Sequence, residues 1–251
     1  MKKAIMVTLL SSAALMLFAA PADAAEKKTT TTDVGVSFKN DAPTIPAEDM
    51  KPYKNNLAVV WKPGSFQFGE QTAVAGTAIF NNIKGDNGGT AANNNTELSQ
   101  YLVVNDDREL KTEGKNSAWA LRADMSALKT VDGAAELQAA KLTMDLNAPK
   151  MYDIGTAIDP KDNDFVANEP WAAGVLTDFD SKSGIELAPT ATLEAAGTSK
   201  VDIFTKKTAN DFRSGVATTI QNVKLHVTDA KQGGKAFTGT ITWTLDDAPT
   251  F

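Results

Sequence analysis

The sequence predicts an all-β protein, built as a single-domain β-sandwich or open barrel with long polar loops and at most two short helices. Three observations support this fold class. Hydrophobic and polar residues alternate with period two in several stretches. Clusters of Gly, Asn, Asp, Pro and Ser separate these stretches, about every ten residues along the chain. The chain after residue 24 is also long enough to bury one large β core.

The first 24 residues have the pattern of a cleavable signal peptide. Lys2 and Lys3 give a positive start, an apolar stretch covers 4–20, and Ala22 and Ala24 have the A-x-A spacing that signal peptidase requires. The apolar stretch contains two serines and is short for a membrane span. We therefore predict a signal peptide over 1–24, cleavage after Ala24, export, and no membrane insertion of the mature chain.

The β domain is expected to span 33–251, after a flexible lead-in over 25–32, whose sequence is AEKKTTTT. Alternating hydrophobic residues predict strands at 34–38, 119–125, 140–146 and 223–227. Any short helix, of which we expect at most two, should lie within 126–139 or 190–198, which are rich in alanine. Long surface loops are predicted at 84–96 and 159–170, where Gly, Asn, Asp and Pro cluster.

The last strand shows the clearest alternation in the chain. One face carries Phe237, Gly239, Ile241, Trp243 and Leu245, and the other carries Thr238, Thr240, Thr242 and Thr244. A helix would place residues two apart about 200° from each other, whereas a strand puts both side chains on one face. The spacing of Trp243 and Leu245 therefore fits a strand. Gly233 and Gly234 supply the turn of the hairpin that leads into it.

The composition excludes several kinds of catalytic and metal site. The chain has no cysteine and one histidine, His226, which the alternation places on the polar side of its strand. Cys–His catalysis and His-rich zinc sites are therefore excluded. The acidic clusters at 159–164 and 178–180 lack the ligand spacing of a calcium loop. We expect no enzyme activity, no cofactor and no bound metal.

The charge and the lack of cysteine also limit the possible partners and compartment. A net charge of −6 disfavours nucleic acid and anionic membranes as partners. Secreted animal domains of this kind often carry disulfides, so an exported chain without cysteine fits a bacterial envelope better.

Four ordered segments resemble the WxL domain of Gram-positive surface proteins. They are PGSFQFGE (63–70), YLVVNDDRELKTEGKNSAWALRADMSAL (101–128), ELQAAKLTMDL (136–146) and FTGTITWTLDDAP (237–249). The second contains a D-x-R sequence and the first Trp-x-Leu, and the fourth contains the second Trp-x-Leu. Together they extend the resemblance over most of 33–251.

The resemblance implies a secreted, non-enzymatic domain that attaches non-covalently to the cell wall at the cell surface. The implied ligand is peptidoglycan or another cell-wall glycan. The resemblance also implies other surface proteins as partners, including other WxL-type proteins. The alternative function is therefore a protein–protein docking module whose association with the wall is indirect.

The motif residues Trp119, Leu121, Trp243 and Leu245 are the predicted binding residues, and Trp171 is a secondary candidate in a Pro- and Gly-containing loop. An indole face stacks on the CH face of a sugar and also anchors protein interfaces. The same residues on one face of a strand are equally compatible with a hydrophobic core. The alternation does not decide which face of the strand is inward, so both roles stay open.

Overall fold

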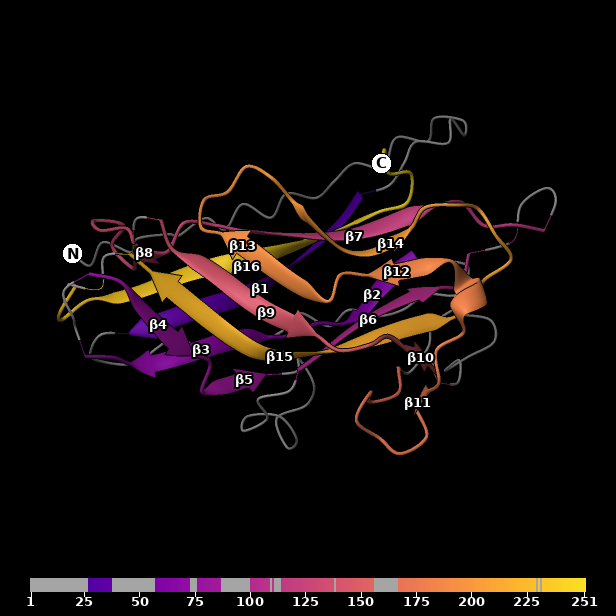
Figure 1. Cartoon of the computed structure of the whole chain (residues 1–251), viewed down its shortest axis with the longest axis horizontal. Helices are drawn as coiled ribbons and strands as arrows, with labels where there is room; N and C mark the ends of the chain where they lie inside the picture. The colour runs from indigo at the N-terminus through magenta and orange to yellow at the C-terminus, as the bar shows by residue number, and fades with distance from the viewer. Residues whose placement is uncertain are drawn as a thin grey trace, which may run out of the picture.

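The computed structural model describes residues 27–37, 57–72, 76–86, 100–108, 110, 114–137, 139–155, 167–228, 230 and 232–251 (Figure 1). The predicted signal peptide, 1–24, lies outside the described residues. So do most of the two predicted loops: within 84–96 only 84–86 are described, as a short strand, and within 159–170 only 167–170 are described.

The described strands form two β-sheets, layered one over the other (Figure 1). In hydrogen-bonded order, the first sheet contains β12 (Ile185–Leu187), β14 (Val201–Lys206), β7 (Trp119–Met125), β16 (Ala236–Asp246), β1 (Lys27–Ser37), β3 (Ser65–Glu70) and β5 (Lys84–Asp86), and β8 (Lys129–Thr130) pairs with β16. The second contains β11 (Leu176–Thr177), β10 (Lys150–Tyr152), β15 (Gly215–Val227), β6 (Gln100–Asp106) and β2 (Leu57–Trp61). Also in the second sheet, β4 (Ala78–Asn81) and β9 (Lys141–Leu146) pair with β15, and β13 (Thr190–Glu194) pairs with β9.

The observed fold confirms the predicted class, and of the two predicted architectures it is the sandwich. The sheets are antiparallel apart from the parallel pair β1 and β3. Helix is limited, in the described residues, to one 3₁₀ turn, Ser181–Ser183. Neither range from which a short helix could come, 126–139 or 190–198, is helical in its described residues, and 129–130 form β8. Residues 190–194 form β13 instead, because Ala191 and Leu193 alternate with exposed residues and face the core.

The main core fills the space between the sheets. It contains inward-facing residues from both layers, such as Leu121 and Ile241 of the first sheet and Leu142 and Leu225 of the second. The alternation that predicted strands at 119–125 and 237–245 therefore marks residues that meet in this core.

The first strand corrects the predicted flexible lead-in over 25–32. β1 begins at Lys27 and pairs with β16 along its whole length, with Lys27 opposite Asp246 and Ser37 opposite Ala236. Its four threonines are polar, which suggested flexibility, but β-branched residues also favour extended backbone. β1 lies between β16 and β3, so it supplies hydrogen-bonding partners to both strands.

Candidate functional site

The two Trp-x-Leu segments lie side by side in the first sheet. β7 and β16 pair antiparallel, with Leu121 opposite Leu245 and Ala123 opposite Trp243. Residues opposite each other in a ladder share a face, so both motifs point to the same side of the sheet. The small Ala123 faces the large indole of Trp243, which leaves space for that ring at the closest position on the neighbouring strand.

All four motif side chains are buried. The exposed fractions are 0% for Trp119, Leu121 and Trp243, and 1% for Leu245. Their shared face points into the sandwich, where they join the main core. They have no surface through which to touch a wall glycan or a partner protein. Their prediction as direct contact residues is therefore not supported by the structure, and their observed role is core packing.

The indole of Trp243 is anchored by a buried hydrogen-bond chain. Its Nε1 donates to Oγ1 of Thr32 in β1 at 2.6 Å, and that hydroxyl donates to the carbonyl of Pro63 at 2.6 Å. Thr32 is fully buried. The chain connects the last strand, the first strand and the segment that leads into β3, so the second motif fixes three parts of the first sheet.

The indole of Trp119 is held differently. Its Nε1 is buried and has no hydrogen-bond partner among the described residues. Trp119 begins β7 and lies opposite Lys206, the last residue of β14. The first motif therefore lies next to a buried charge, at the end of the sheet where β14 ends.

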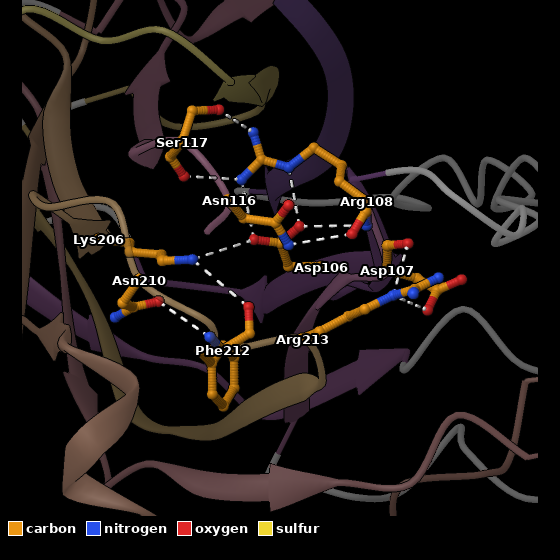
Figure 2. A network of polar contacts seen from close by, with 9 residues as sticks. All are labelled: Asp106, Asp107, Arg108, Asn116, Ser117, Lys206, Asn210, Phe212 and Arg213. Atoms are coloured by element: carbon orange, nitrogen blue, oxygen red, sulfur yellow. Dashed lines mark hydrogen bonds and ion pairs between the residues drawn. The ribbon is translucent and has the colours of Figure 1, made fainter. Parts of the chain in front are cut away.

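That buried charge belongs to a polar network, which we call the Asp106 cluster (Figure 2). Asp106 ends β6, and its carboxylate accepts bonds from Nε and Nη2 of Arg108, both at 2.8 Å. Nζ of Lys206 lies 3.6 Å from the second carboxylate oxygen. The side chains of Asp106 and Lys206 are 1% and 0% exposed, so these charges are almost completely removed from water.

The Asp106 cluster extends to the segments on either side. Arg108 donates to the hydroxyl of Ser117 at 2.7 Å and to its carbonyl at 2.9 Å, just before β7. Asn116 donates to the carbonyl of Arg108 at 3.0 Å (Figure 2). It also forms a backbone bridge with Asn210. The cluster thus connects the end of β6 in one sheet with the start of β7 and the end of β14 in the other.

Lys206 is the residue of the Asp106 cluster whose charged form is disfavoured by burial. Burial lowers its pKa from the usual value, and the neighbouring carboxylate of Asp106 opposes that shift. Nζ also lies 3.4 Å from the carbonyl of Phe212 and 5.9 Å from the centre of its ring, a cation–π distance (Figure 2). Because its buried charges pair residues at the ends of β6 and β14, which belong to different sheets, the cluster is suited to holding the two sheets in register.

Sequence reasoning did not identify the Asp106 cluster. Its one sequence signal is the D-x-R sequence of Asp106 and Arg108, which lies in the 101–128 segment that resembles the family pattern. The buried partner, Lys206, lies about a hundred residues away and has no neighbouring pattern that singles it out.

Trp171, the secondary candidate, lies at the surface. It is partly exposed, and its ring contacts that of Trp61 in an edge-to-face arrangement, with centroids 5.3 Å apart and planes at 68°. Tyr101 is also partly exposed, and its ring centroid lies 6.0 Å from that of Trp171. The two tryptophans outside the motif therefore meet at the surface, while those inside it are core.

The other features singled out in the sequence do not form a site. His226 is half-buried, and its Nε2 lies 3.0 Å from the hydroxyl of Thr143. The described residues contain no group of His, Cys, Asp or Glu that could hold a metal ion, and 159–164 lie outside them. No helix in the described part of the chain is long and apolar enough to cross a membrane.

Comparison with known proteins gives one match. The family model described as "WxL domain surface cell wall-binding" matches residues 25–249, nearly the whole chain. No curated protein and no solved structure matches the chain. The matched range includes both motifs, the Asp106 cluster and the three surface aromatic residues.

Replacing Thr32 by Val tests the anchor of the second motif. The variant keeps the shape of the side chain but leaves the indole N–H of Trp243 and the carbonyl of Pro63 buried without a partner. We expect the free energy of unfolding to fall by about 1–3 kcal/mol in urea denaturation. Thr192→Val, on the exposed face of edge strand β13, is the matched control and should change it by less than about 0.5 kcal/mol. Equal stability of the two variants would contradict the anchor.

Replacing Asp106 by Asn tests the buried ion pair. The change leaves Lys206 buried without a counter-charge and removes the ionic acceptor of Arg108, so we expect a loss of about 3–5 kcal/mol of unfolding free energy. The control is Asp178→Asn, which removes the exposed partner of Lys150 and should leave the unfolding transition nearly unchanged. An Asp106→Asn variant as stable as its control would show that the Asp106 cluster does not stabilise the fold.

Proposed function

Because the chain belongs to the WxL domain family of surface cell wall-binding proteins, we propose that it attaches to the wall non-covalently by binding peptidoglycan. The observation that carries this proposal is the extent of the family match, 25–249, which includes every described strand of the sandwich. The wall-binding domain is therefore the sandwich itself. Export through the leader at 1–24 and a Gram-positive source belong to the same proposal.

The burial of the motifs restricts how such a domain binds. Trp119 and Trp243 support the sandwich from inside, so contact with the wall has to come from side chains on its outer surfaces. The binding surface is then separate from the motif by which the family is recognised, and the motif acts by holding that surface in shape. No catalytic step is required, because attachment needs only complementarity to the glycan.

A protein-docking module is the second candidate, and one observation favours it. Ile79 and Ile83, on and just after β4, are each 60% exposed. Among the described strands β4 pairs with β15 alone, at an edge of the described part of the second sheet. Exposed apolar side chains at a sheet edge are a common feature of surfaces that add a partner's strand.

Co-sedimentation distinguishes the two candidates. We expect the purified chain from Ala25 onward to sediment with Gram-positive cell wall stripped of protein, in the presence of a metal chelator. Because the attachment is non-covalent, denaturant should release the whole chain from the pellet at its unchanged mass. Protein that stays in the supernatant until a surface protein is added back would contradict direct binding and support docking.

A further inference from the structure

We propose that Trp61, Tyr101 and Trp171 form the surface that contacts a sugar ring of the wall glycan. This inference rests on the proposed function and deepens it by assigning the contact to named residues. The three residues are distant in sequence and meet on the outer face of the second sheet, where we call them the aromatic surface cluster. Trp61 and Tyr101 pack over a small group of buried residues separate from the main core: Val60, Val103, Tyr152, Val175 and Ala217.

A β-bulge turns Trp61 outward. In a regular strand Trp61 would face the same side as Val59, which packs in the main core. The pairing of β2 with β6 shifts register between these two residues, so that Val59 lies opposite Val104 but Trp61 lies opposite Val103. The extra residue moves the indole from the interior to the outer face. Bulges that re-aim one side chain in this way are frequent next to functional sites.

Hydrogen bonds hold the aromatic surface cluster in place. Nε1 of Trp61 donates to the carbonyl of Asn168 at 2.9 Å and lies 3.1 Å from the hydroxyl of Tyr152. That hydroxyl donates to the same carbonyl at 2.6 Å. The backbone N–H of Asn168 in turn donates to the carbonyl of Ile154 at 3.1 Å. The segment that carries Trp171 is thus fixed to the sheet. The protein would therefore lose little conformational freedom when it binds a ligand.

The chemistry of the aromatic surface cluster favours a sugar. Partly exposed rings meeting at 68° and 51° offer flat apolar faces, which match the CH face of a pyranose. Polar residues accompany the rings: Thr219 lies opposite Tyr101 in the ladder, and Glu169 is two residues before Trp171 in the chain. A small apolar area with polar groups at its border is typical of a ligand site, whereas protein docking uses a larger apolar patch.

Titration of the unmodified chain with chitotetraose, a soluble N-acetylglucosamine oligomer, tests the location directly. We expect the indole N–H signals of Trp61 and Trp171 to shift in NMR spectra, and those of the buried Trp119 and Trp243 to stay in place. Shifts confined to other residues, or no shift although the chain binds stripped wall, would overturn the proposal. This measurement requires no variant, so it does not depend on folding of a mutant.

Two substitutions then measure the contribution to wall binding. Trp171→Ala and Tyr101→Ala should each weaken co-sedimentation with stripped wall by at least about five-fold, as expected for loss of an interface anchor. Val131→Ala, at an exposed apolar residue directly after β8 in the first sheet, is the matched control and should bind like the parent. Circular dichroism melts check that each variant is folded.

The outcomes separate this inference from the proposed function. If the parent chain does not sediment with stripped wall, the proposed function fails. If the parent sediments and the folded Trp171→Ala and Tyr101→Ala variants sediment equally well, the function stands and the assignment of the contact is wrong. If the variants keep wall binding but lose a protein partner, the aromatic surface cluster is a docking surface and the sugar assignment is likewise overturned.

Discussion

The antiparallel pairing of β7 with β16 is the interaction on which the rest of the structure depends. It places Leu121 against Leu245 and brings two motifs from opposite parts of the chain onto one face. Because that face is the inner one, two large indoles and two leucines occupy the middle of the sandwich. Because the two strands run antiparallel, the tryptophans lie on opposite sides of the leucine pair. The two copies of the motif therefore form one continuous set of core residues.

Polar interactions hold the strands on both sides of the β7–β16 pair. On the side of β16, Thr32 accepts the indole N–H of Trp243 and ties the first strand into the sheet. At the start of β7, Trp119 adjoins the Asp106 cluster, whose ion pair links the ends of β6 and β14. A buried pair of this kind adds little net stability, since the cost of removing it from water offsets the attraction, whereas an arrangement that leaves one charge unpaired is strongly destabilised. The shape of the outer surface is then a consequence of buried contacts.

Period-two alternation predicts many of the strands, but it does not tell which face of a strand points to the core. The alternation located β7 and β16 and placed each tryptophan with its leucine, yet the residues between them, Ala120 and Thr244, are buried too. Polarity alone therefore could not assign the inward face. The first part of β1, 27–32, was missed because its threonines resemble a polar linker, and only the edge of β16 shows why they are extended. The outward turn of Trp61 depends on one extra residue in a strand, which leaves no sequence signature.

The central claim is that the motif tryptophans are structural and the other two tryptophans are at the surface. Adding a soluble paramagnetic agent to the protein and recording the four indole ring signals by NMR tests this most directly. The structure predicts strong broadening for Trp61 and Trp171, which are partly exposed, and little for Trp119 and Trp243, which are 0% exposed. Broadening of Trp119 or Trp243 as strong as that of Trp171 would contradict the account and restore the motif as a contact surface.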